Sequence, residues 1–112
     1  MFDYIEKLST IDDFKELKEN NEKVVFIFSA TWCPDCVMLD RFFEETVNKF
    51  NDMKFIYIDR DTFPEITEAL EVFGIPSFIA YKNNKEVSRF VSKFSKTQQE
   101  VEDFLSENND HP

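Results

Sequence analysis

Residues 24–30 (Val-Val-Phe-Ile-Phe-Ser-Ala) form a nearly uninterrupted apolar run that is rich in β-branched and aromatic side chains. A run of this kind is typical of a strand inside a sheet that is covered on both faces. Residues 55–58 (Phe-Ile-Tyr-Ile) repeat the pattern. Between the two runs, apolar residues recur at helical spacing: Leu39, Phe42, Phe43, Val47 and Phe50. Strand, helix and strand in this order predict a parallel pair joined by a crossover helix.

Three further helices are predicted from apolar spacing and from residues suited to cap a helix start. They begin after Ser9 or Thr10, after Thr62 with Glu65 as its capping-box partner, and after Ser95 or Thr97 with Gln98 or Glu100 as partner. The second of these helices is expected to turn one apolar face toward the core, made of Ile66, Ala69, Leu70 and Phe73.

Three further strands are predicted, at residues 2–5, 77–81 and 86–91. The last two form a hairpin, because Asn83 and Asn84 between them tolerate the positive φ of a tight turn. The expected fold class is therefore α/β: a three-layer domain with a central mixed β-sheet flanked by helices on both faces. We expect a single domain over residues 1–112, with residues 106–112 as a frayed tail.

The chain carries a formal net charge of −10 at pH 7. This excess of carboxylates repels phosphate backbones and anionic lipid surfaces, so neither nucleic acid nor a membrane is an expected partner. Residues 1–7 lack the basic and apolar pattern of a secretory signal, and the longest apolar run is too short to span a bilayer. We therefore expect a cytoplasmic protein whose cysteines meet a reducing environment.

Both cysteines lie in one motif, Trp-Cys-Pro-Asp-Cys at residues 32–36. Such a pair can hold a metal, close a structural disulfide or exchange thiols with a substrate. No metal site is expected, since a structural zinc site needs four ligands and the only histidine, His111, lies in the tail. A disulfide across so short a loop removes little chain entropy. Thiol exchange is the favoured chemistry.

The position of the motif after a buried strand gives the two thiols different roles. Cys33 opens the following helix, with Pro34 at the first helical position, where a missing N–H costs nothing. The free N–H groups and the dipole of that helix end favour a thiolate, so Cys33 is the expected nucleophile. Cys36 lies on the same helical face one turn further on, where it can resolve a mixed disulfide.

Three stretches resemble the thioredoxin family, and the likeness covers essentially the whole chain. They are Ala-Thr-Trp-Cys-Pro-Asp-Cys at residues 30–36, Tyr-Ile-Asp at residues 57–59 and Gly-Ile-Pro-Ser at residues 74–77. The resemblance implies a thioredoxin fold and catalysis by Cys33 and Cys36 through a reversible disulfide, with no bound cofactor. It also implies a cis peptide between Ile75 and Pro76. A plainer alternative is that this proline only starts an edge strand.

The resemblance also implies where substrates bind. The expected substrate-binding residues are Trp32, Pro34, Ile75 and Pro76. The backbone of Ile75 would pair with an extended substrate strand, and Trp32 would shape the docking surface. The plainer alternative for the tryptophan is that it covers the core.

The chain departs from the family pattern at several positions. Ile27 stands where the family has a buried aspartate, and the lysine that partners this aspartate falls at Phe55. Asp35 is therefore a candidate for proton handling, although an acidic residue also simply suits a first helical turn. Arg41 replaces a helix-kinking proline and Ser92 replaces a glycine beside the groove. These last two changes suggest substrates unlike those of a general thioredoxin.

The expected function is that of a cytoplasmic thiol–disulfide oxidoreductase that reduces protein or small-molecule disulfides. An NADPH-dependent thioredoxin reductase would restore the dithiol, and the protein would act as a monomer. Two alternatives stay open. One is a glutaredoxin-like reductase of mixed disulfides that is coupled to a small thiol, and the other is a non-catalytic adaptor built on the same fold.

Overall fold

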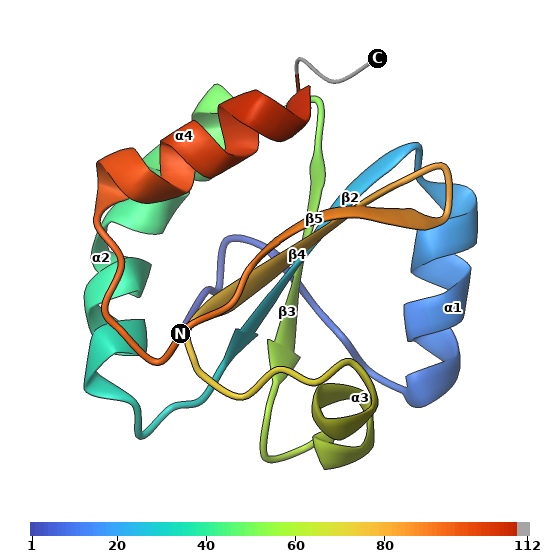
Figure 1. Ribbon diagram of the computed structural model, residues 1–112, viewed down its shortest axis with the longest axis horizontal. Helices are drawn as coiled ribbons and strands as arrows, with labels where there is room; N and C mark the ends of the chain where they lie inside the picture. The colour runs from blue at the N-terminus through green and yellow to red at the C-terminus, as the bar shows by residue number, and fades with distance from the viewer. Residues whose placement is uncertain (110–112) are drawn as a thin grey trace.

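The computed structural model describes residues 1–109, and its centre is a five-stranded sheet with the strand order β1-β3-β2-β4-β5 (Figure 1). The strands are β1 (Glu6–Lys7), β2 (Lys23–Ser29), β3 (Lys54–Asp59), β4 (Ser77–Lys82) and β5 (Lys85–Phe90). β3 runs parallel to β1 and β2, whereas β4 is antiparallel to β2 and β5. The mixed sheet confirms the predicted α/β class.

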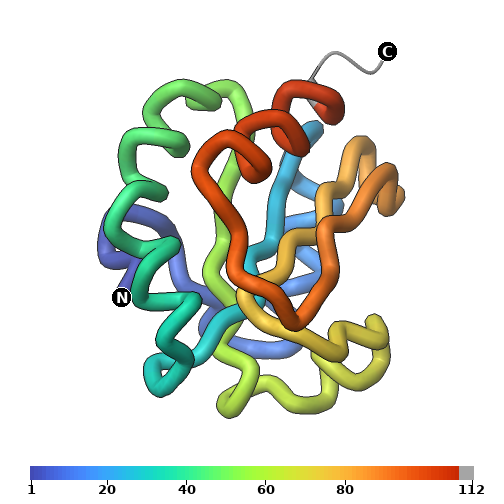
Figure 2. Tube along the Cα trace, turned by 60° about the vertical axis from the view of Figure 1, so that its left-hand side comes forward, coloured from blue at the N-terminus to red at the C-terminus, as the bar shows by residue number. Residues whose placement is uncertain are grey.

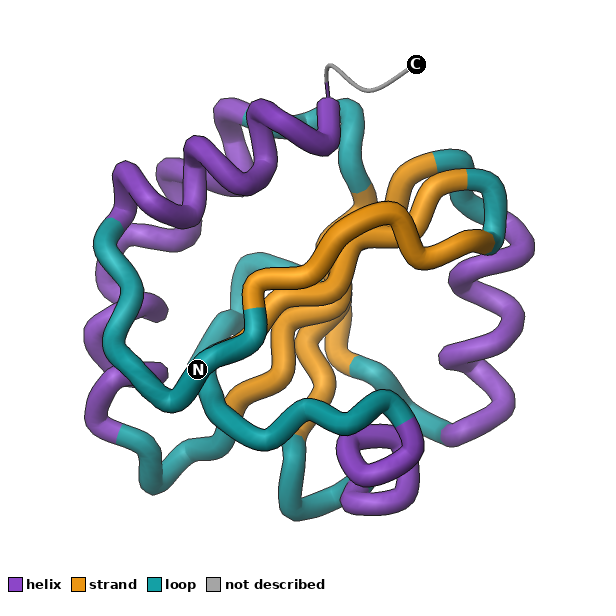
Figure 3. The backbone as a smooth tube through the Cα atoms, viewed as in Figure 1, coloured by secondary structure: helices purple, strands orange, loops and turns teal. Residues whose placement is uncertain are grey.

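Four helices cover the two faces of this sheet (Figure 3). α1 (Ile11–Asn20) and α3 (Pro64–Ala69) pack on one face, while α2 (Pro34–Lys49) and α4 (Gln98–Asn109) pack on the other. Figure 2 shows α4 lying beside α2, in agreement with Figure 1 and with their direct contact. The three-layer arrangement is the one predicted.

Alternate residues of β2 supply the two layers of the core. Val24, Phe26 and Phe28 face α1 and α3, whereas Val25 and Ile27 face α2 and α4. All five side chains are at most 1% exposed. Burial of a side chain of this size contributes about 1.5–3 kcal/mol. The strand is therefore buried on both faces, as its apolar run predicts, and it places its carboxyl end beside the cysteine motif.

Two predicted helix starts are confirmed in detail. The hydroxyl of Thr10 accepts the backbone N–H of Asp13 at 3.2 Å, so this residue caps α1. Thr97 and Glu100 form a reciprocal capping box before α4. The Glu100 N–H donates to the Thr97 hydroxyl at 3.1 Å, and the Thr97 N–H donates to the Glu100 carboxylate at 3.0 Å.

The predicted hairpin of β4 and β5 is also present. Asn83 and Asn84 join the strands with φ values of 51° and 67°, in the left-handed region that asparagine tolerates. A register shift between Ala80 and Tyr81 marks a bulge in the pairing.

The prediction of a first strand at residues 2–5 is wrong. β1 covers only Glu6–Lys7, because the preceding residues form a turn that is tied to α2. Phe2 has a φ of 54°, and its N–H donates to the carboxylate of Asp40 at 2.9 Å. The Tyr4 hydroxyl donates to the same carboxylate at 2.9 Å. Residues 2–5 therefore anchor the N-terminus instead of extending the sheet.

The predicted capping box of Thr62 and Glu65 is wrong as well. α3 begins at Pro64, and the residue before it makes no side-chain cap. The carboxylate of Asp59, at the end of β3, instead accepts the N–H groups of Asp61 at 2.8 Å and Thr62 at 3.1 Å. An aspartate five residues before the start of α3 thus organises the entry to this helix.

The predicted apolar face of α3 is correct only in part. Ile66 is buried and Leu70 packs against the same cluster. Ala69 is exposed, and Phe73 is 80% exposed because the helix ends at Ala69 and the chain turns at Glu71, where φ is 56°. Phe73 therefore lies beyond the helix and points to solvent.

The C-terminal segment is more ordered than predicted. α4 continues to Asn109, so fraying from residue 106 is wrong for residues 106–109. The side chain of Asn108 is buried and donates to the Phe104 carbonyl at 2.7 Å. Residues 110–112, which include His111, lie outside the described part of the chain. Within residues 1–109, no helix has both the length and the apolar character needed to cross a membrane.

Candidate active site

Cys33 lies where the chain leaves β2 and enters α2. It is the N-cap residue of this helix, and its Sγ accepts the backbone N–H of Cys36 at 3.3 Å. Its carbonyl accepts the N–H of Val37 at 3.1 Å. Pro34 is exposed and occupies the first helical position, as predicted. The unpaired N–H groups of this helix end favour negative charge on the sulfur.

Cys36 lies inside the first turn of α2 and has different surroundings. Both cysteines are free thiols, and Cys36 is 0% exposed whereas Cys33 is 5% exposed. Burial raises the pKa of the Cys36 thiol to about 12, and the hydrogen bond with Cys33 adds to the rise. A hydrogen bond with the hydroxyl of the buried Ser29 acts in the opposite direction. Cys36 therefore stays protonated at neutral pH until its proton is taken up.

The loop before β4 packs against Cys33. The peptide between Ile75 and Pro76 is cis, as the family resemblance implies. The Cys33 thiol donates to the Ile75 carbonyl, with 3.9 Å between sulfur and oxygen. Both loop residues are buried. The neighbouring Gly74 has no room for a side chain, because a Cβ there would collide with the backbone of Ser92.

Three exposed aromatic side chains lie next to these segments, and we name Trp32, Phe73 and Phe94 the aromatic rim. Their side chains are 59%, 80% and 68% exposed, respectively. Trp32 therefore does not cover the core. Its indole N–H donates to the carboxylate of Asp61 at 2.7 Å, and the Arg60 guanidinium lies 5.9 Å from its ring centre. These contacts hold the indole at the surface beside Cys33.

Ile27 has two aromatic neighbours on β3. It pairs with Tyr57, while Phe55 pairs with Val25 and lies in the same core cluster as Ile27. The placement of the family's lysine position at Phe55 stays a prediction. The Tyr57 hydroxyl donates to Asp59 at 3.4 Å. Burial, followed by the negative charge of this aspartate, raises the pKa of Tyr57. Neither Ile27 nor Tyr57 supplies the buried acid and base of the family pattern at neutral pH.

Asp35 is half-buried in the first turn of α2, between the two thiols in sequence. Its charge interacts with that of Lys96, a lysine before α4 that is only 7% exposed. α2 passes through Arg41 without a break, as expected from the missing proline. A role of Asp35 in proton handling stays a prediction.

Sequence reasoning missed four residues of this region. The sequence pattern predicts Phe73 on a buried helix face, and it does not distinguish Ser29, Phe94 or Lys96 as residues of the site. Ser29 carried one available signal, since it is the polar residue in an otherwise apolar run. The burial of Lys96 and the exposure of the two phenylalanines depend on contacts between distant segments, which leave no local pattern.

No cluster of three or more side chains able to hold a metal occurs within the described residues 1–109. His111 is outside this range, so the structure does not place it.

A family model, curated relatives and a solved structure all match this chain to thioredoxins. The family model described as Thioredoxin matches residues 6–107. Thioredoxin H2 of Arabidopsis thaliana is 36% identical over 78 residues, which are 70% of this chain and 59% of the plant protein. Thioredoxin of Gallus gallus is 40% identical over 88 residues, or 77% of this chain and 84% of that protein. The crystal structure of oxidized mitochondrial thioredoxin 3 from Saccharomyces cerevisiae superposes with a TM-score of 0.82 and 26% identity, covering 93% of this chain and 95% of that one.

Proposed function

Because this chain belongs to the thioredoxin family of thiol–disulfide oxidoreductases, we propose that Cys33 and Cys36 carry its activity and that it acts mainly as a reductant. One observation carries this proposal. The Cys33 sulfur caps α2, where negative charge is favoured, and contacts the carbonyl of the cis peptide before Pro76. Cys36 lies behind it in the interior, within hydrogen-bonding distance.

The proposed reaction has two exchange steps. First, the Cys33 thiolate attacks one sulfur of a substrate disulfide, and the substrate S–S bond breaks as the mixed disulfide forms. The other substrate sulfur leaves with the electron pair as a thiolate. Second, the Cys36 thiolate attacks the Cys33 sulfur, which closes the Cys33–Cys36 disulfide and releases the remaining substrate thiolate. Two electrons pass from the protein to the substrate, and Cys36 must lose its proton before the second step.

The aromatic rim and the loop around Pro76 form the proposed docking surface. The backbone of Ile75 would pair with an extended substrate segment, and Trp32 and Pro34 would contact the residues that flank the substrate cysteine. An open hollow of about 460 Å³ adjoins the rim, since Phe73 and Asp61 both line it. Exposed aromatic side chains in this position favour disulfides that lie within an apolar peptide segment.

The partners of the reaction follow from the same proposal. An NADPH-dependent thioredoxin reductase would return the Cys33–Cys36 disulfide to the dithiol, and no bound cofactor is needed. We propose a cytoplasmic monomer on the basis of the sequence. The solved yeast relative is a mitochondrial protein, so cell fractionation is the appropriate test of the location.

Reduction of a protein disulfide, such as those of insulin, tests the function. With thioredoxin reductase and NADPH present, we expect turnover by the parent protein and only the uncatalysed rate with Cys33→Ser. Cys36→Ser is the matched control, because it retains the first step and should accumulate a mixed disulfide visible by mass spectrometry.

The alternatives predict other outcomes of the same assay. An inactive parent protein would favour the adaptor. Turnover with glutathione and its reductase, but not with thioredoxin reductase, would favour the glutaredoxin-like enzyme.

A further inference from the structure

Lys96 is a buried lysine in the segment between β5 and α4, although lysine is rarely buried without a partner. Its ammonium donates to the Ser92 carbonyl at 3.2 Å, the Ser92 hydroxyl at 3.1 Å and the Phe94 carbonyl at 2.9 Å. It also lies 5.1 Å from the centre of the Phe90 ring. A protonated lysine has three N–H bonds, and each finds an acceptor here, so these contacts favour the protonated form of Lys96.

These hydrogen bonds connect Lys96 to the cysteine motif through a short chain of contacts. Lys96 donates to the Ser92 carbonyl oxygen, and this oxygen lies directly against Gly74. A Cβ atom added to Gly74 would come closer to this oxygen than to any other atom. Gly74 directly precedes Ile75, whose carbonyl accepts the hydrogen of the Cys33 thiol. Lys96 therefore fixes the backbone against which the cis-proline loop rests.

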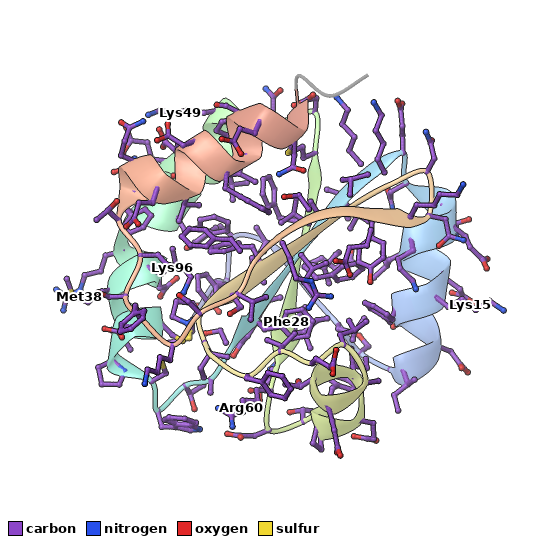
Figure 4. The ribbon with its side chains drawn as sticks, viewed as in Figure 1. Lys15, Phe28, Met38, Lys49, Arg60 and Lys96 are labelled. Carbon is purple, nitrogen blue, oxygen red and sulfur yellow. The ribbon has the colours of Figure 1, made fainter. Side chains whose placement is uncertain are left out.

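The charge of Lys96 also faces the active site. Figure 4 shows its side chain beside α2 and the segment that precedes α4. The charged and titratable groups that act on it are Cys36 and Asp35 of α2, Cys33 at the N-cap of α2 and Glu100 of α4, with Cys36 the strongest. Burial lowers the pKa of Lys96, while these four groups oppose this change when they are anionic. By reciprocity, a positive charge here acts in favour of a Cys36 thiolate, while burial and the hydrogen bond with Cys33 are the main causes of the raised pKa of that thiol.

We propose that Lys96 is a positioning residue of the active site, which holds the backbone of residues 92–94 against Gly74 and favours the Cys36 thiolate in the resolving step. The inference rests on the proposed function, in which Cys36 resolves the mixed disulfide. Cys36 loses its proton to solvent or a neighbouring base, and Lys96 keeps its own. The thiolate then attacks the Cys33 sulfur, the bond to the substrate sulfur breaks, and that sulfur leaves with the electron pair.

A symmetric nitrobenzoate disulfide, whose released thiolate is yellow, separates the two steps in one stopped-flow experiment. The first thiolate reports attack by Cys33, and the second reports resolution by Cys36. Lys96→Met should slow the second phase about tenfold near neutral pH and move its pH profile about one unit upward. The first phase should change by about twofold at most, because the interaction with Cys33 is the weakest of the four.

Two variants serve as controls. Lys96→Arg keeps the charge and should stay within about twofold of the parent protein in both phases. Lys85→Met removes an exposed lysine at the start of β5, outside residues 92–94 and outside the aromatic rim, and should leave both phases unchanged. If Lys96→Met does not fold, Lys96→Gln removes the charge while it keeps hydrogen-bond donors, and the same shift is expected.

The outcomes separate this inference from the proposed function. An unchanged pH profile in Lys96→Met or Lys96→Gln overturns the role of Lys96, as does a rate that falls equally at every pH. An equal shift in Lys85→Met also overturns it. If the parent protein releases no second thiolate, the resolving role of Cys36 fails, and with it the proposed function.

Discussion

Asp35 and Lys96 bring opposite charges to the same pair of thiols. Asp35 is half-buried in the first turn of α2, and its negative charge acts to raise the pKa of Lys96. A carboxylate in the first turn of a helix interacts favourably with the helix dipole, and it repels an anion that forms beside it. It is also a candidate to accept the proton of Cys36, whose thiol pKa is raised to about 12 by burial. The two effects act on different steps of the reaction.

Replacement of Asp35 by asparagine distinguishes these effects, because it removes the charge and keeps the size. With the nitrobenzoate disulfide, we expect Asp35→Asn to speed the first phase about threefold, since the nucleophile loses a repelling neighbour. We expect the second phase to slow by about the same factor, since Cys36 loses its nearby base. Glu44→Gln, an exposed charge further along α2, is the control. Both phases faster would leave Asp35 a purely electrostatic role, and no change in either would exclude both roles.

At the level of single residues, the sequence predicts the site residues whose roles depend on their neighbours along the chain. Cys33, Pro34 and Cys36 are recognisable because the strand before them and the helix after them can be read from adjacent residues. The hydroxyl of Ser29 and the ammonium of Lys96 reach Cys36 only through the packing of β2 and of the segment before α4 on α2. Such contacts between distant segments are not encoded in a short motif.

Among the elements, α4 is fastened to α2 through one carboxylate. Glu102 accepts the Thr46 hydroxyl at 2.8 Å, the Lys49 ammonium at 3.2 Å and the Gln98 amide at 3.0 Å. Burial raises the pKa of Glu102, but hydrogen bonds from Gln98, Thr46 and Lys49 together outweigh it and lower the pKa. The folded protein therefore prefers the ionised form of Glu102. Its hydrogen bonds hold α4 against α2, next to the segment that contains Lys96.

We expect Glu102→Gln to lower the free energy of unfolding by about 1 kcal/mol at pH 7, since charge-assisted hydrogen bonds are lost. A lowered pKa stabilises the fold above the unfolded value of about 4.3 and loses its effect as the pH falls below it. The difference between parent and variant, measured by urea unfolding, should therefore shrink between about pH 4.5 and pH 3. Glu107→Gln, an exposed charge on the same helix, is the control. A difference that persists unchanged at pH 3 would contradict this account.

The elements themselves were predictable where apolar period and capping chemistry agree. The strands β2 and β3, the capping of α1 by Thr10 and the capping box of α4 meet this condition. The turn at residues 2–5 was not predictable in this way. Its apolar residues have the pattern of a strand, and the hydrogen bond from the Phe2 N–H to Asp40 of α2, which forms the turn, joins residues far apart in the sequence. Likewise, the start of α3 is set by Asp59 from the end of a strand, which takes the hydrogen bonds that Thr62 was expected to organise.

At the scale of the whole molecule, the net charge of −10 produces a negative electrostatic potential around the protein. This potential acts on every substrate that approaches Cys33. Asp35 and Asp61 add negative charge close to the motif and the aromatic rim. Cationic disulfides should therefore reach the site faster than anionic ones of the same size.

Three small disulfides test this expectation, and they differ only in their end groups: cystamine with two ammonium groups, dithiodipropionate with two carboxylates and hydroxyethyl disulfide with none. At about 10 mM ionic strength, where the screening length is about 30 Å, we expect Cys36→Ser to react with cystamine about tenfold faster than with dithiodipropionate. At about 1 M salt, where this length is about 3 Å, the ratio should approach the one set by the reactivity of the disulfides alone. The neutral disulfide should show little salt dependence. A ratio that does not change with salt would mean that contacts at the rim, and not the field of the whole protein, select the substrate.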